Sequence, residues 1–122
     1  MMGRVASLFA LAVCGFGVSI AAAQNPNLIE YRGDQGPGRG KHIVLLSGDH
    51  EYRSEETLPM LARILARRYG FRCSVLITTD PKTGFIEPGS SNIQGLEILK
   101  SADLVIVFLR FQDFPDAEMQ HI

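Results

Sequence analysis

Two uninterrupted apolar runs, at residues 43–46 and 104–109, restrict the fold of this chain more than any other sequence feature. A strand with one face in water alternates apolar and polar residues. A strand covered on both faces is apolar throughout, as in a parallel sheet. Another strand is expected between the two runs, at residues 72–78. It is the second strand in chain order, and the run at residues 104–109 is the third. The sequence therefore predicts three buried parallel strands.

A predicted helix connects the first two strands. Apolar residues recur at helical spacing from residue 58 to residue 69, with arginines between them, and Gly70 supplies a stop signal. Ser54 is one candidate for the cap at the start of this helix. If the helix starts there, Pro59 lies inside it and removes a hydrogen bond, so Thr57 is the alternative cap.

The predicted order of elements is β-α-β-α-β-α, with short helices at residues 93–99 and 115–122. Right-handed crossovers between parallel strands then give an α/β fold with three layers, in the flavodoxin-like strand order 2-1-3. Such a sheet keeps an open edge, and no stop signal follows the last helix. We therefore expect the N-terminal part of a longer α/β domain, truncated after its third strand.

Residues 1–23 resemble a secretory signal peptide. One charge, Arg4, precedes an uncharged stretch, and Ala21-Ala22-Ala23 provides an A-x-A cleavage site. The expected localisation is therefore periplasmic or extracellular, without membrane contact after cleavage. An uncleaved membrane anchor is the alternative, and acylation at Cys14 ranks below both. Residues 24–40 contain several glycines and prolines and are expected to be a linker or irregular leader, which leaves residues 41–122 as the domain.

Composition excludes two classes of function. The chain has 12 basic and 13 acidic residues and a net charge of −1, so it lacks the basic excess on which nucleic-acid binding depends. Two cysteines, Cys14 and Cys73, provide neither a disulfide framework nor a zinc site. Cys73 is expected to be a small buried strand residue.

Polar residues follow the first and third predicted strands. In a sheet of order 2-1-3, ligands bind where the carboxyl ends of these two strands meet, because the strand order reverses there. The candidate site residues after the first strand are Asp49, His50, Glu51, Tyr52 and Arg53, and those after the third strand are Arg110 and Asp113.

Each residue type suggests a role in that site. His50 is a candidate general base or metal ligand, and Glu51 a candidate group to orient or assist it. Arg53 and Arg110 are candidates to bind an anionic or hydroxylated ligand. The structural alternatives are a turn stabilised by Asp49 and an ion pair between Arg110 and Asp113 or Asp49. His42 and His121 are expected to be structural or exposed.

Several sharper motifs do not occur in the sequence. Ser54 stands where the second histidine of an HExxH zinc motif would be. The first strand is followed by neither a phosphate-binding loop nor a GxGxxG sequence, and no GxSxG elbow supplies a nucleophile. The sequence thus identifies no cofactor, metal, oligomeric state or reaction.

Three segments together resemble the ThuA-like (trehalose utilisation) family. They are KHIVLLSGDHEYRSEE at residues 41–56, the helix that runs on to Gly70-Phe71, and ADLVIV at residues 102–107 before Arg110. The run HEYRSEE after the first strand is the most distinctive part. The resemblance covers residues 41–122.

This resemblance implies a class I glutamine amidotransferase-like fold, a role in sugar metabolism and a site at the loops after the first and third strands. The leading hypothesis is an exported domain that binds or transforms a carbohydrate or sugar-derived compound. His50 is then the acid/base group or a ligand contact. The alternatives are a non-enzymatic ligand-binding or interaction module of a larger secreted protein and an amidotransferase with its cysteine elbow further along the chain.

Overall fold

A computed structural model describes residue 25 and residues 27–122 of the chain. The predicted signal peptide and its two alternatives fall outside these residues. Within the described part of the chain, no helix has both the length and the apolar character required to cross a bilayer.

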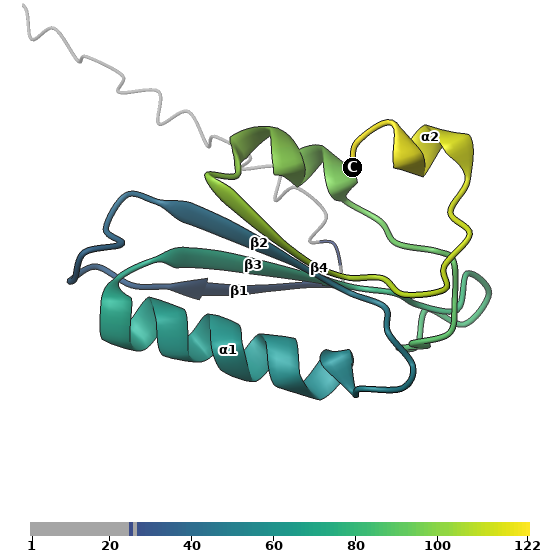
Figure 1. Cartoon of the computed structure of the whole chain (residues 1–122), viewed down its shortest axis with the longest axis horizontal. Helices are drawn as coiled ribbons and strands as arrows, with labels where there is room; N and C mark the ends of the chain where they lie inside the picture. Colours follow the sequence, from purple (N-terminus) through teal and green to yellow (C-terminus); the bar gives the residue numbers. More distant parts are fainter. Residues whose placement is uncertain (1–24, 26) are drawn as a thin grey trace, which may run out of the picture.

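The described residues form an α/β fold around one mixed sheet (Figure 1). Its elements are the strands β1 (Leu28–Arg32), β2 (His42–Ser47), β3 (Arg72–Ile77) and β4 (Leu104–Phe108), the α-helices α1 (Ser54–Tyr69) and α2 (Asp116–Met119), and the 3₁₀ helix η1 (Leu96–Ser101). The strand order is β1-β3-β2-β4. β2 is parallel to β3 and β4, whereas β1 is antiparallel to β3. The three parallel strands thus have the predicted order.

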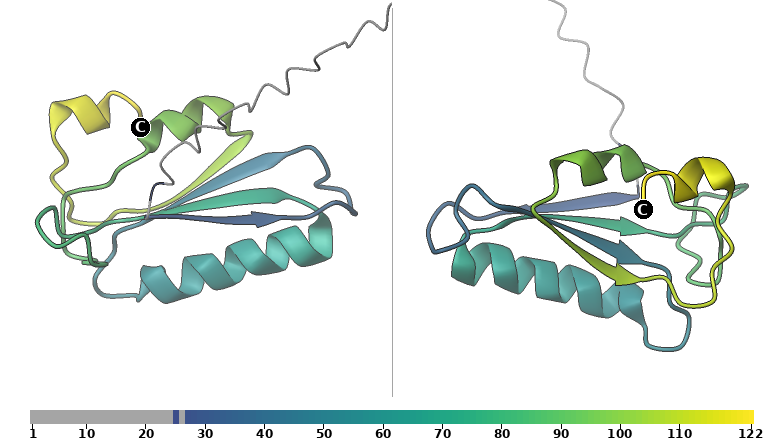
Figure 2. Two further views of the ribbon diagram at one scale, coloured as in Figure 1. Left: turned by 180° about the vertical axis from the view of Figure 1, so that it is seen from behind. Right: turned by 45° about the horizontal axis from the view of Figure 1, so that its top comes forward.

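The helices make the outer layers. Figure 2 shows α1 along one face of the sheet and η1 and α2 over the other. Alternate residues of the central strand β2 enter two apolar clusters. Ile43 and Leu45 pack with Leu58, Ala62 and Ala66 of α1. On the opposite face, Val44 and Leu46 pack in a second cluster with Ile93, Leu96 and Phe114. Every residue of β2 is buried, and the apolar run at residues 43–46 predicts this for the middle of the strand.

The prediction of a buried third strand is wrong for β4. Four of its five residues are exposed, including Leu104 at 52% and Val107 at 50%. β4 lies at the end of the strand order, and α1 packs mainly over β1, β3 and β2. An apolar sequence indicates what a strand is able to bury, but not which neighbour covers it. Within the part of the chain that the structure describes, β4 is therefore an apolar edge strand.

The segment expected to be a linker also differs from the prediction. Residues 28–32 form β1, which makes the sheet mixed rather than fully parallel. The glycines that follow β1 pack against the end of α1. Gly38 donates its N–H to the Tyr69 carbonyl at 2.8 Å, and a Cβ on Gly36 would lie 2.5 Å from that oxygen. These glycines permit close backbone packing, not flexibility.

The helix boundaries are only partly as predicted. α1 begins at Ser54 and contains Pro59, so the alternative start at Thr57 is wrong. It ends at Tyr69 and is capped by Gly70, where φ is 80° and the N–H donates to the Ala66 carbonyl. The helix expected at residues 93–99 is a 3₁₀ helix shifted to residues 96–101, because Gly95 adopts a positive φ of 88° immediately before it.

Candidate functional site

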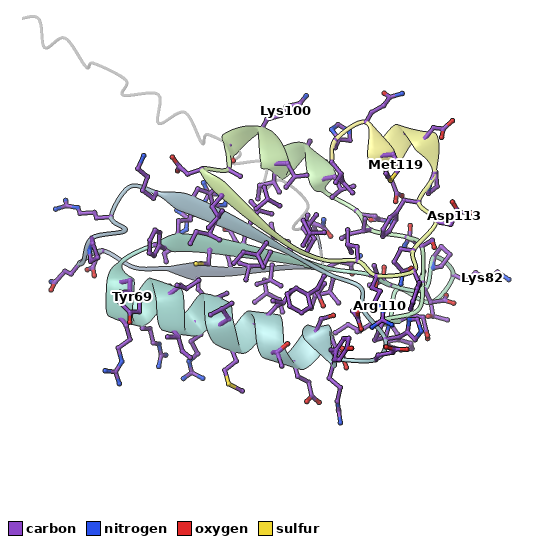
Figure 3. The ribbon with its side chains drawn as sticks, viewed as in Figure 1. Tyr69, Lys82, Lys100, Arg110, Asp113 and Met119 are labelled. Carbon is purple, nitrogen blue, oxygen red and sulfur yellow. The ribbon has the colours of Figure 1, made fainter. Side chains whose placement is uncertain are left out.

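The loops after β2 and β4 meet at one end of the sheet, as the strand order predicts. Gly48 donates its N–H to the carbonyl of Phe108 at 2.8 Å. The Gln112 amide then donates to the Gly48 carbonyl at 2.6 Å and to the Pro88 carbonyl at 3.1 Å. Figure 3 shows Arg110 and Asp113 at this end of the sheet, away from Tyr69 at the other end. Gln112 thus links three loops.

Asp49 builds the first of these loops. Its side chain is 3% exposed, and its Oδ1 accepts the N–H groups of Glu51 at 2.8 Å and Tyr52 at 3.0 Å. Desolvation raises the pKa of Asp49, but these two hydrogen bonds and the nearby Arg110 outweigh it and lower the pKa overall. The geometry matches the turn-stabilising alternative for Asp49, because its carboxylate is satisfied by its own loop.

Two buried serines hold the same loop in place by hydrogen bonds. Ser54 is fully buried, and its hydroxyl accepts the N–H of Asp49 at 3.1 Å and donates to the Asp49 carbonyl at 3.2 Å. Ser47 at the end of β2 donates to the Ser54 hydroxyl at 3.0 Å. Ser54 is therefore not a simple helix cap. No sequence pattern predicts this role, since only the folded loop brings position 54 back to the end of β2.

Arg110 lies at the centre of a cluster of polar and aromatic side chains. Its Nη1 lies 2.9 Å from Oε2 of Glu51 and donates to the Tyr52 hydroxyl at 3.1 Å. The guanidinium carbon lies 4.4 Å from the centroid of the Phe111 ring and 5.6 Å from that of Tyr52. Both rings are largely exposed, Phe111 at 72% and Tyr52 at 60%. We refer to Glu51, Tyr52, Arg110 and Phe111 as the Arg110 cluster.

His50 lies beside this cluster. It is exposed, and its ring centroid is 6.5 Å from that of Phe111. The expectation that Glu51 orients His50 is not met by the structure, because the Glu51 carboxylate pairs with the Arg110 cation. The predicted ion pair of Arg110 with Asp113 or Asp49 is likewise replaced by the pair with Glu51.

Arg53 and Asp113 do not join the Arg110 cluster. Arg53 forms ion pairs with Glu56 and Glu55 in the first turn of α1. Asp113 is exposed, and its backbone N–H donates to the Ser91 hydroxyl at 3.0 Å. Of the seven predicted site residues, the structure joins Glu51, Tyr52 and Arg110 by direct contacts, places His50 beside them and gives Asp49 a supporting position.

Each of the two loops contains a non-glycine residue with a strained backbone conformation. Arg53 has a φ of 51° and Phe111 a φ of 58°, and in the described part of the chain they are the non-glycine residues with positive φ. Such conformations cost about 1–3 kcal/mol each and concentrate at functional sites. Arg53 directly follows Tyr52, and Phe111 directly follows Arg110. The strain thus coincides with the cluster.

His42 has a structural role at the opposite end of the parallel strands. It is 5% exposed, its Nε2 lies 2.9 Å from the Ser74 hydroxyl, and its Nδ1 lies 3.1 Å from both the carbonyl and the hydroxyl of Ser101. This network connects β2, β3 and η1. The prediction for His42 is confirmed.

The described residues contain no group of three or more His, Cys, Asp or Glu side chains placed to hold a metal ion. Cys73 is fully buried in β3, as predicted, and desolvation raises the pKa of its thiol to about 11. A buried thiol with such a pKa is a poor nucleophile. The chemistry that these residues offer at the site is hydrogen bonding, ion pairing and ring stacking, and the imidazole of His50 adds a further hydrogen-bonding group.

Comparisons with known proteins identify no relative of this chain. No family model matches the sequence, and neither the curated proteins nor the solved structures provide a significant match.

Proposed function

We propose that this chain is a ThuA-like α/β domain that binds a carbohydrate or sugar-derived compound at the carboxyl ends of β2 and β4. The proposal includes the class I glutamine amidotransferase-like fold, with its flavodoxin-like strand order, and export of the mature domain. The observation that carries it is the Arg110 cluster, in which one cation, one carboxylate and two exposed rings, one of them a phenol, lie together.

A sugar offers hydroxyl groups at its edge and C–H groups on its ring faces. Arg110 and Glu51 are charged hydrogen-bonding groups, which bond to hydroxyls more strongly than neutral groups do. Tyr52 and Phe111 present apolar rings, one of which carries a polar hydroxyl. The Arg110 cluster therefore supplies both kinds of contact that a sugar ring needs, on loops held in place by Asp49, Ser54 and Gln112.

His50 is the proposed acid/base group or ligand contact. Its exposure leaves the imidazole accessible to a ligand bound over Phe111. The two ring nitrogens of an imidazole can donate and accept hydrogen bonds, which suits either role.

A binding module without turnover is the second candidate. The observation that favours it is the Arg110–Glu51 ion pair, because a carboxylate engaged by arginine does not orient His50 as a catalytic base. Both candidates use the same Arg110 cluster and differ in whether a bound sugar is transformed.

The test begins with the full-length sequence expressed in an exporting host. Sugar binding is measured by calorimetry across neutral and anionic mono- and disaccharides, and turnover by chromatography of the incubated sugars. Arg110→Ala should abolish binding. Arg39→Ala, which removes an exposed arginine from the loop before β2, should leave binding unchanged.

His50→Ala distinguishes the two candidates. Loss of turnover with binding retained supports a catalytic His50, and binding by the wild type without turnover supports the binding module. A folded wild-type protein that binds no sugar in the panel overturns the proposal.

A further inference from the structure

The side of α1 that faces away from the sheet combines apolar and basic side chains. Leu58, Ala62 and Ala66 lie on the inner side of the helix and pack against the sheet. Residues three and four positions apart lie on the same side of a helix. Five exposed residues share the opposite side by this spacing: Met60, Arg63, Ile64, Arg67 and Arg68. We refer to these five residues as the outer α1 face.

The outer α1 face is basic, although the whole chain has a net charge of −1. No acidic residue occurs between Thr57 and Thr79. Within the described residues, none of the three arginines of this face forms an ion pair. Arg67 and Arg68 complement the helix dipole in the last turn, whereas Arg63 lies too far from the helix end for that role. These cations therefore favour an anionic partner.

Two large apolar side chains lie among the three arginines. Met60 is 63% exposed and Ile64, one turn further along, is 47% exposed. An anionic polymer would engage the arginines alone. The surface of a bilayer accepts both kinds of side chain, because its phosphate groups lie directly above its acyl chains. Packing a further layer of protein over this face would bury three cations, which is costly unless each is paired. The combination therefore favours a lipid surface.

We propose that the outer α1 face binds the surface of a bilayer that contains anionic phospholipids. Its two apolar side chains enter the boundary between headgroups and acyl chains, and its three arginines bind the lipid phosphates. The contact is peripheral and does not involve residues 1–23. It differs from the expectation of no membrane contact after cleavage, because that expectation took only residues 1–23 into account. This inference is independent of the proposed function.

Binding in this orientation leaves the candidate site open. Figure 1 shows α1 along one face of the sheet, so a bilayer at the outer α1 face would run roughly parallel to the sheet. Arg110 and Asp113 lie at one end of the sheet and not on the outer side of α1 (Figure 3). A ligand is therefore able to reach the Arg110 cluster while α1 contacts the bilayer.

The first test is co-sedimentation of the exported and processed protein with lipid vesicles. Mass spectrometry verifies that residues 1–23 have been removed, because that apolar segment would bind vesicles by itself. We expect binding to vesicles of phosphatidylglycerol and phosphatidylcholine in equal parts, weaker binding at high salt, and much weaker binding to pure phosphatidylcholine. A folded wild-type protein that binds neither kind of vesicle, or binds both equally, overturns the proposal.

A pair of double variants tests whether the outer α1 face makes the contact. Arg63→Gln/Arg67→Gln should weaken binding to the anionic vesicles roughly thirtyfold, because each basic residue near such a surface contributes about fivefold. The matched control is Lys82→Gln/Lys100→Gln, which removes the same charge from two exposed lysines away from α1 (Figure 3). Circular dichroism and thermal unfolding verify that each variant is folded. Equal effects of the two double variants overturn the assignment to this face.

A fluorescent reporter tests whether the apolar side chains enter the bilayer. The chain contains no Trp, so Met60→Trp introduces a single indole. Its emission should shift to the blue on binding to the anionic vesicles and be quenched by lipids with brominated acyl chains. Lys100→Trp is the control and should show neither effect. An unshifted emission of Met60→Trp in the vesicle-bound protein overturns the proposed orientation.

Heparin distinguishes a bilayer from an anionic polymer. Heparin presents sulfates and carboxylates but no acyl chains, so it has no site for the two apolar side chains. We expect weaker binding of the wild type to heparin than to the anionic vesicles, with unshifted Met60→Trp emission. Binding to heparin through Arg63 and Arg67, without binding to vesicles, overturns the lipid assignment in favour of an anionic polymer.

Discussion

The Nη1 atom of Arg110 lies 2.9 Å from Oε2 of Glu51 and so connects the loop after β4 to the loop after β2. Arg110 is 43% exposed and Glu51 48% exposed, and an ion pair at such a position contributes about 0–1 kcal/mol to stability. Its main effect is on the charge that the site presents to a ligand, because each partner neutralises the other.

Glu51→Gln should therefore change ligand preference more than stability. The free energy of unfolding in urea should change by no more than about 0.5 kcal/mol. Binding should shift from neutral sugars toward anionic sugar derivatives, because the Arg110 charge is no longer balanced. Calorimetry with a matched pair, a sugar and its phosphate, measures this shift. An unchanged ratio of the two affinities would show that Glu51 does not control the charge of the site.

Asp49→Asn should weaken the fold in a pH-dependent manner. The folded protein lowers the pKa of Asp49, so the ionised carboxylate stabilises the protein above its unfolded pKa of about 3.9. This stabilisation is lost as the pH falls through the lower folded pKa. Urea unfolding should show a lower stability than the wild type at pH 7 and a smaller difference near pH 3. Asp34→Asn, at an exposed aspartate, is the control and should have little effect at either pH.

Cys73 should resist thiol reagents while the protein is folded. Its thiol is buried and its pKa is raised to about 11, so little thiolate is present or accessible at pH 8. Iodoacetamide labelling followed by mass spectrometry should show slow reaction in buffer and fast reaction in urea. A Leu104→Cys variant provides an exposed thiol for comparison, because position 104 is 52% exposed. Equal rates at positions 73 and 104 in the folded protein would contradict the buried position of Cys73.

Gly36→Ala should destabilise the protein although position 36 lies in a surface segment. Gly36 has a φ of 128°, and an added Cβ would lie 2.5 Å from the Tyr69 carbonyl oxygen. The expected loss is about 1–3 kcal/mol in the free energy of unfolding, the cost of a strained backbone. Gly89→Ala is the control, because its Cβ would approach only the flexible end of Glu87. Equal stability of the two variants would contradict the close packing of residues 33–40 on α1.

Some of the fold follows from the sequence because burial leaves a periodic signature. The apolar run at residues 43–46 of β2 reflects the covering of one of its faces by α1 and of the other by η1. The position of α1 follows from the helical spacing of Leu58, Ala62 and Ala66, which face the sheet. The meeting of the loops after β2 and β4 follows from strand order alone.

Other features depend on contacts that no local pattern reports. The sequence of β1 predicts an irregular segment because the glycines after it indicate flexibility. Their packing against α1 depends on tertiary structure. The exposure of β4 depends on the absence of a described neighbour beyond it in the sheet. The pairing of Glu51 with Arg110 joins two loops that are far apart in the sequence, and no local pattern predicts which cation a loop carboxylate meets.

The antiparallel direction of β1 determines where the chain enters the sheet. Leu28 pairs with Leu76 near the carboxyl end of β3, and the Asn27 amide donates to the Thr79 hydroxyl at 3.1 Å. The entry point is therefore at the same end of the sheet as the Arg110 cluster, and two strand spacings, about 10 Å, separate β1 from β2. An affinity tag fused just before Asn25 would start close enough to compete with a ligand. Binding measurements should accordingly use protein tagged after Ile122 or freed of its tag.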